Sequence, residues 1–136
     1  MRLNAYRVDP DGYRRLLAWN THLARGPLEP ALRALGANLE ALELGKERAQ
    51  VRRAEVRMAL RSARRRKETY DLIFIDPPYS QARDWGPELS MALPSLLRPD
   101  ARVVVESDRR VPMELELALE RERRYGDTSI RIHVHQ

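Results

Sequence analysis

Residues 70–79, Tyr70-Asp71-Leu72-Ile73-Phe74-Ile75-Asp76-Pro77-Pro78-Tyr79, carry the clearest indication of the fold of this 136-residue chain. Its centre, residues 71–76, is a short apolar run closed by an aspartate. Such a run is typical of a strand buried on both faces of a parallel sheet. The two prolines cannot continue a sheet ladder, so the strand ends there. Ligands of open α/β sheets bind outside the carboxyl ends of strands, so the stretch predicts a binding site directly after Asp76.

The residues that follow this strand alternate between helix and strand patterns. We expect a helix over 82–97, a second buried strand over 101–106, and two further strands over 115–124 and 128–135. Tyr125-Gly126-Asp127 between the last two is a predicted hairpin turn. This order predicts an α/β sheet whose last strand is antiparallel to its neighbours.

The residues that precede the strand are richer in helix patterns. Leucines spaced three and four apart predict a helix over 29–44, and residues 10–24 are predicted as another. A short strand is expected over 50–55 and a strongly basic helix over 56–67. The length suits one domain over residues 1–136, with residues 1–28 the least typical part of it.

Composition narrows the classes of function. The net charge of +5 and the pI of about 10.1 favour a partner that carries phosphate, or an anionic membrane surface. There are no cysteines, and the histidines at 22, 133 and 135 do not form a spaced metal motif, so we expect no metal site. No apolar run approaches the length of a membrane span and no signal peptide opens the chain, so we expect a cytoplasmic protein.

The chemistry of the Asp-Pro-Pro-Tyr motif suits an amine on a nucleic-acid base. Such an amine is a poor nucleophile because its lone pair is delocalised into the ring. Asp76 supplies a carboxylate, and Pro77 a carbonyl on a backbone of fixed φ, to accept its two N–H groups and aim the lone pair at a methyl group. Tyr79 offers a flat face on which an extruded base stacks. A strand end with a Pro-rich turn and a surface tyrosine is the alternative interpretation.

A basic stretch precedes the strand. Residues 46–67 hold ten lysines or arginines against two glutamates, and the run ends in Arg64-Arg65-Arg66-Lys67. We expect this run to clamp an RNA backbone beside the site, and a solvated helix face is the alternative. The arginines expected to extend the same surface are Arg109, Arg110, Arg123 and Arg124.

From about Pro30 onwards the chain resembles the bacterial small-subunit (16S) ribosomal RNA (guanine-N2) methyltransferases. The resemblance covers roughly three quarters of the chain. It rests on residues 31–35, 38–42 and 51–56, the stretch 70–79, Val103-Val104-Val105-Glu106 with Asp108-Arg109-Arg110, and Arg123-Arg124-Tyr125-Gly126-Asp127-Thr128. Many amine methyltransferases share Asp-Pro-Pro-Tyr, and the Tyr-Gly-Asp-Thr hairpin narrows the resemblance to the ribosomal RNA group.

The resemblance implies a Rossmann-like methyltransferase sheet, S-adenosylmethionine as cofactor, and ribosomal RNA or the small ribosomal subunit as partner. It implies that Asp76, Pro77, Pro78 and Tyr79 hold the target guanine, with Asp76 also near the cofactor. It places Glu55 where the family has an aspartate at the cofactor's adenine.

The amino-terminal part departs from this family. The family has a Gly-rich cofactor loop, but no two of the glycines at 12, 26, 36, 45, 86 and 126 are close enough to form it. The acid expected at the cofactor ribose is also missing, with Glu29, or Asp9 after a strand-like Tyr6-Arg7-Val8, as substitutes. We therefore expect a fold incomplete at its amino terminus, from a truncated or frameshifted reading frame, and weak cofactor binding. Two alternative functions are a non-catalytic RNA-binding remnant and an adenine-N6 DNA methyltransferase.

Overall fold

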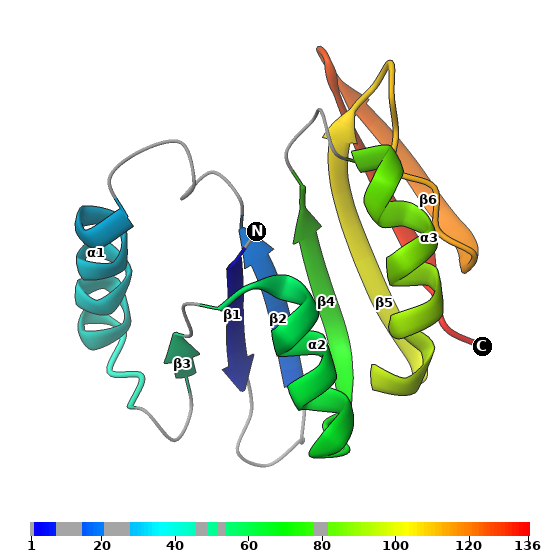
Figure 1. Cartoon of the computed structure of the whole chain (residues 1–136). Coiled ribbons are helices and arrows are strands. Elements are labelled where there is room, and N and C mark those ends of the chain that lie inside the picture. The colour runs from blue at the N-terminus through cyan, green and yellow to red at the C-terminus, as the bar shows by residue number, and fades with distance from the viewer. Residues whose placement is uncertain (1, 8–14, 21–27, 46–48, 52–53, 78–81) are drawn as a thin grey trace.

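The computed structural model describes residues 2–7, 15–20, 28–45, 49–51, 54–77 and 82–136. They form one seven-stranded sheet in the order β3-β1-β2-β4-β5-β7-β6 (Figure 1). The strands are β1 (Arg2–Arg7), β2 (Arg15–Asn20), β3 (Ala49–Val51), β4 (Tyr70–Asp76), β5 (Leu97–Asp108), β6 (Ala118–Tyr125) and β7 (Thr128–Val134). The helices are α1 (Leu28–Ala41), α2 (Val56–Arg65), α3 (Ala82–Ala92) and the short 3₁₀ turn Pro94–Leu96.

The apolar strand β4 lies at the centre of the sheet. It pairs in parallel with β2 on one side and with β5 on the other. Beyond β5 the chain turns back, because β7 is antiparallel to both β5 and β6. The predicted α/β sheet with a carboxyl-terminal antiparallel hairpin is therefore confirmed.

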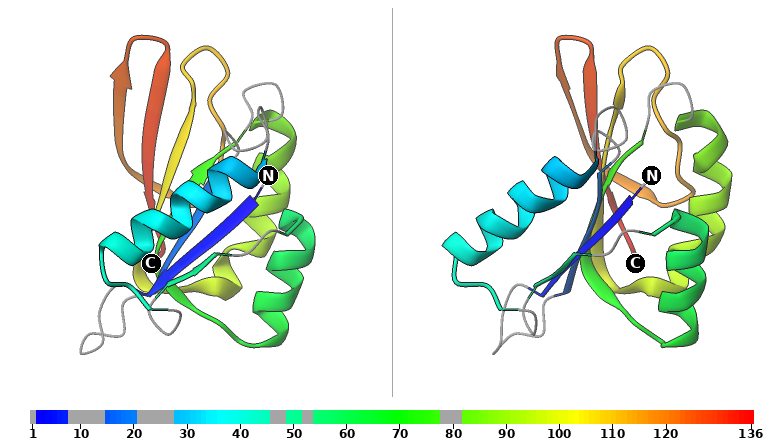
Figure 2. Two further views of the ribbon diagram at one scale, coloured as in Figure 1. Left: turned by 90° about the vertical axis from the view of Figure 1, so that its left-hand side faces the viewer. Right: turned by 60° about the vertical axis from the view of Figure 1, so that its left-hand side comes forward.

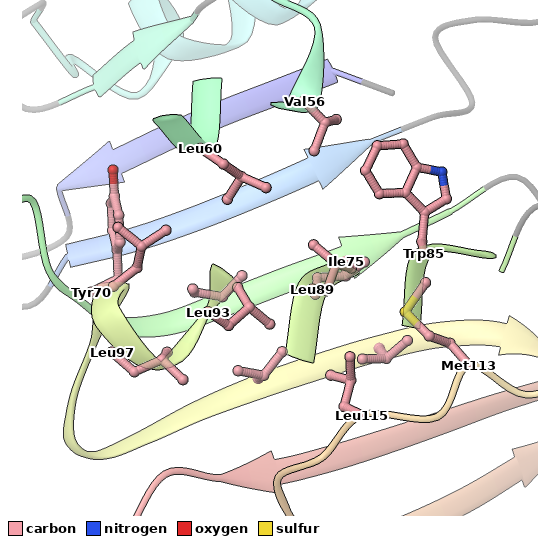
Figure 3. Close-up of a cluster of buried hydrophobic side chains, with 14 of the residues drawn as sticks. Val56, Leu60, Tyr70, Ile75, Trp85, Leu89, Leu93, Leu97, Met113 and Leu115 are labelled. Carbon is pink, nitrogen blue, oxygen red and sulfur yellow. The ribbon is translucent and has the colours of Figure 1, made fainter. Parts of the chain in front are cut away.

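The helices cover the sheet unequally. Figure 2 shows α2 and α3 on one face, while α1 lies on the other side, at the β3 edge. The main core fills the space between the sheet and the helices α2 and α3, where Leu89 and Leu93 have no exposed surface (Figure 3). Ile73 of β4 and Val103 of β5 are also fully buried in this core. The alternation along β5 explains this packing, since Val103, Val105 and Ser107 are buried while their neighbours are not.

Most predicted elements are confirmed with shifted ends. The helix predicted over 82–97 ends at Ala92, because Pro94 has no N–H to continue it, and the last part becomes the 3₁₀ turn and the start of β5. The short strand predicted over 50–55 is Ala49–Val51, and Glu55 instead begins α2.

The helix predicted over 10–24 is wrong for the part that the structure describes. Residues 15–20 form β2, inserted between β1 and β4. A run with Leu16, Leu17 and Trp19 fits a helical stripe and a buried strand equally well when only the sequence is read. Pairing of β2 with both neighbours decides in favour of the strand, because it satisfies the backbone groups on both of its edges.

Candidate active site at the carboxyl edge of the sheet

The centre of the candidate site is the point where β4 ends. Asp76 is the last residue of β4, half-buried and paired with Asn20 of β2, and Pro77 after it is buried. On the other side, Ile75 pairs with Val105 of β5. Three parallel strands thus run toward one edge around Asp76, the place where α/β sheets bind ligands. Pro78 and Tyr79 lie outside the described residues, so their roles stay predictions.

A cluster of buried apolar side chains packs against the end of β4. Trp85 of α3 is 8% exposed and lies with Ile75, Met113 and Val56 beside the end of β4 (Figure 3). The Arg57 guanidinium stands 4.8 Å from the centre of the Trp85 ring. These contacts join α2, α3 and β4, so the backbone around Asp76 is held by tertiary packing from several elements.

An ion pair at the protein surface links α2 to α3. Arg57 donates to Glu88 from Nε at 2.8 Å and from Nη2 at 2.9 Å, a two-point contact between α2 and α3. The Glu88 carboxylate raises the pKa of Arg57, which stays charged. Sequence reasoning missed both Arg57 and Trp85, since the only signal was a tryptophan on the apolar side of a predicted helix.

Contacts with α3 also fix the segment between β5 and β6, which leads into the hairpin. The Ser90 hydroxyl donates to the Gly86 carbonyl at 2.8 Å and accepts the Glu116 N–H at 2.9 Å. The backbone of Glu114 also passes so close to α3 that a Cβ on Gly86 would lie 2.4 Å from the Glu114 carbonyl oxygen. The route from β5 to β6 is therefore set by direct backbone contact with α3.

Glu55, the predicted adenine contact, caps a helix. Its carboxylate accepts the Met58 N–H at 3.2 Å, and its extended φ and ψ of −70° and 137° are those of an N-cap residue. The residue is exposed and precedes α2 at the edge where β3 ends. The capping bond uses one carboxylate oxygen, and the cofactor contact of Glu55 stays a prediction.

Asp9 and Glu29 are the residues predicted to replace the acid that binds the cofactor ribose. Asp9 lies outside the described residues, and β1 before it runs antiparallel to β2, so β1 ends at the edge opposite Asp76. Glu29 lies in the first turn of α1, which contacts the edge strand β3. β1, which ends at Arg7, therefore runs opposite to β4, and the role of Asp9 stays a prediction.

The predicted basic surface is divided between two opposite edges. α2 runs antiparallel to β4, so Arg64, Arg65, Arg66 and Lys67 lie near the start of β4 (Figure 1). The seven residues of β4 span about 20 Å from that edge to Asp76. The expectation of a clamp beside the site is wrong for these four residues. They are close to Asp76 in sequence, but the full length of β4 lies between them and Asp76.

The other four arginines lie at the edge of the candidate site. Arg109 and Arg110 follow β5, and Arg123 and Arg124 are near the end of β6. They do not extend the surface of the α2 residues as predicted, because β5 and β6 both run toward the carboxyl edge. Their role in RNA binding remains a prediction, and their position at the same edge as Asp76 is compatible with it.

The sheet order and the reversed last strand define a Rossmann-like α/β domain with Asp76-Pro77 at the end of its central strand. No helix of the described part is long and apolar enough to cross a membrane. Residues 28–134 match the family described as Conserved hypothetical protein 95, and the chain belongs to that family. The family resemblance inferred from the sequence is thereby confirmed.

Individual relatives agree with this assignment. YlbH of Bacillus subtilis (strain 168), provisionally named an rRNA methyltransferase, is 32% identical over 106 residues, which are 76% of this chain and 57% of YlbH. The chain thus spans little more than half the length of that relative.

Among solved structures, yhhF of Escherichia coli, provisionally named a methyltransferase, superposes with a TM-score of 0.58 at 24% identity, over 76% of this chain and 56% of yhhF. A protein from Streptococcus mutans, provisionally named a SAM-dependent methyltransferase, gives a TM-score of 0.58 at 16% identity, over 73% and 34%. At these identities the likeness establishes the fold.

Proposed function

We propose that this chain is the methyl-transferring part of an S-adenosylmethionine-dependent methyltransferase that modifies the exocyclic amine of a guanine in small-subunit ribosomal RNA. The observation that carries the proposal is Asp76-Pro77 at the carboxyl end of the central parallel strand in a member of this family. The provisional name of YlbH supports ribosomal RNA as the substrate. The cytoplasm, where ribosomes are assembled, is the proposed location.

Asp76 and Pro77 orient the amine. The carboxylate of Asp76 accepts one N–H of the amine and the carbonyl of Pro77 accepts the other, which favours a pyramidal nitrogen with its lone pair aimed outward. Because Pro77 is buried and its φ is fixed, the carbonyl is positioned before the substrate arrives. Tyr79, three residues after Asp76, is the proposed stacking partner for the extruded base.

The cofactor fits this chain only in part. The bound cofactor supplies an electrophilic methyl group, and Glu55 and Asp76 are the proposed residues on its side of the site. The chain lacks the pair of close glycines that lets a loop approach a nucleotide cofactor. We therefore expect weak binding, and low-micromolar affinity measured by calorimetry would contradict this.

A methylation assay tests the function. The chain is incubated with tritiated S-adenosylmethionine and small ribosomal subunits that lack the modification, and the labelled nucleotide is identified after digestion. We expect label in N2-methylguanine, and its loss in Asp76→Ala. Asp100→Asn is the matched control, because Asp100 lies at the opposite edge of the sheet and its positive φ of 63° suits asparagine.

The outcomes separate the three candidate functions. No transfer by a folded chain that still binds RNA would favour the non-catalytic remnant. Label in N6-methyladenine of a duplex DNA substrate would favour the DNA methyltransferase. Equal activity of Asp76→Ala and the unmodified chain would refute the role given to Asp76.

A further inference from the structure

Three strands form a wall that continues past the end of β4. β5 extends to Asp108 and β6 to Tyr125, and Figure 1 shows this part of the sheet rising beyond the point where β4 stops. The strand register shows how far β5, β7 and β6 extend past the end of β4. Ile75 of β4 pairs with Val105 of β5, so the next residues, Asp76 and Glu106, lie side by side. Glu106 pairs with Ile130 of β7, and Ile130 pairs with Arg123 of β6. The wall then continues for two more residues on each strand.

Arg123 and Tyr125 project from the same face of the sheet as Asp76. Residues directly opposite in a sheet share a face, and side chains alternate along a strand, so Tyr125 lies on that face as well. Three strand spacings, about 14 Å, separate Asp76 from Arg123 across the sheet. A short single-stranded segment that leaves the candidate site along the wall therefore reaches both side chains.

The tip of the wall is held in one conformation. Gly126 has a φ of 56°, which suits the first central position of the two-residue turn between Tyr125 and Thr128. The Arg109 N–H donates to the Asp127 carbonyl at 2.8 Å and so joins the end of β5 to the hairpin tip. A rigid tip loses little conformational entropy when it binds a ligand.

Two acids near the tip, Asp108 and Glu122, are paired with neighbouring arginines. Asp108 accepts from Arg110 at 2.8 Å, and Glu122 accepts from Arg131 at 3.0 Å. Among the arginines of the hairpin and the end of β5, Arg109, Arg121 and Arg123 take part in none of the ion pairs of the described residues. The free positive charge faces solvent beside Tyr125, which is 63% exposed although it is aromatic.

We propose that this wall, defined by Arg109, Arg121, Arg123 and Tyr125, binds single-stranded RNA next to the target base, with a base stacked on Tyr125. An exposed aromatic ring among unpaired cations is the arrangement that binds single strands, because bases stack on the ring while phosphates lie on the cations. The inference rests on the proposed function and adds the path that the RNA takes. That path runs along the hairpin side of the site and not past Arg64 and Arg65.

The test measures binding of a fluorescein-labelled single-stranded 12-nucleotide RNA of mixed sequence to the full chain, by anisotropy, over a range of NaCl concentrations. Tyr125→Ala is expected to weaken binding by about 5- to 100-fold, and Tyr125→Phe to stay within about twofold of the unmodified chain, because the ring is what stacks. Arg123→Ala should lower the slope of log affinity against log salt by about 0.7. Arg64→Ala, which removes the same charge at the opposite edge, should leave the slope unchanged.

Several results would overturn the inference: no RNA binding by the unmodified chain, equal binding by Tyr125→Ala, or loss of slope in Arg64→Ala alone. Tighter binding to duplex DNA than to the RNA would also overturn it. The methylation assay separates the two proposals. Transfer that is insensitive to Tyr125→Ala, with unchanged RNA affinity, removes the RNA path only. Tyr125-dependent RNA binding without any transfer removes the enzymatic function only.

Discussion

Replacing Gly86 with alanine perturbs the contact that fixes the route from β5 to the hairpin. The new Cβ would lie 2.4 Å from the Glu114 carbonyl oxygen, well inside the closest approach that real Cβ atoms show. The obstacle is backbone, so no side-chain rotation relieves it. Overpacking of this kind costs about 1–3 kcal/mol. Gly86 also precedes Pro87, and a Cβ before proline disfavours helical backbone further.

The helix itself opposes this cost. Alanine is preferred to glycine inside a helix by about 1 kcal/mol, which offsets part of the clash. Taking the upper end of the overpacking range for a backbone obstacle leaves a net destabilisation of about 2 kcal/mol. For a domain of this size, that corresponds to a Tm lower by about 8 °C.

Gly36→Ala is the matched control. Gly36 lies inside α1, and a Cβ there meets no atom within 4 Å. Only the helix preference applies, so this variant should be unchanged or up to about 1 kcal/mol more stable. Thermal and urea unfolding followed by circular dichroism measure both variants. A Gly86→Ala protein as stable as Gly36→Ala would refute the close backbone packing of α3 against Glu114.

Three further predictions concern charged groups and a cap. Burial lowers the pKa of His133, so its contribution to stability is full above the ordinary histidine pKa of about 6.5 and is lost as the pH falls below it. His133→Asn should flatten this part of a stability–pH curve, and an unchanged curve would contradict the role of His133. The side-chain and backbone hydrogen bonds from Arg110 lower the pKa of Asp108 from 3.8 to about 2, so the stabilisation is present above pH 3.8 and lost as the pH falls through 2. Titration of the Asp108 carboxyl by NMR should give this low value in the unmodified chain and a higher one in Arg110→Ala, which loses the side-chain bonds but keeps the backbone N–H. Glu55→Ala removes the N-cap of α2 and should cost about 1 kcal/mol in urea unfolding, whereas Glu55→Asn should restore stability because asparagine is a good N-cap. If both variants lose stability equally, the cap is not what Glu55 contributes.

Local patterns predicted the central part of the chain well. The apolar run 71–76 indicated a buried parallel strand, and β4 covers Tyr70–Asp76 between two parallel neighbours. The turn residues around Gly126 indicated the hairpin, because the positive φ of this turn is a local requirement that glycine meets. The position of Asp76 at the carboxyl edge of the sheet followed from the apolar run and the prolines that end it.

Predictions failed where the outcome depends on residues distant in sequence. Residues 15–20 suit a helix or a strand when read alone, and pairing with β1 and β4 made them β2. Arg64 to Lys67 are close to Asp76 in sequence but lie at the opposite edge, since β4 runs its full length between them.

Composition and residue types at short spacings were enough to predict the strand that ends at Asp76, the basic charge and the family. The folded chain was needed to show which basic residues share an edge with Asp76 and how Trp85, Arg57 and Gly86 hold that edge. The physical reason is that strand direction, register and backbone contact depend on the pairing of distant segments, which no local pattern encodes.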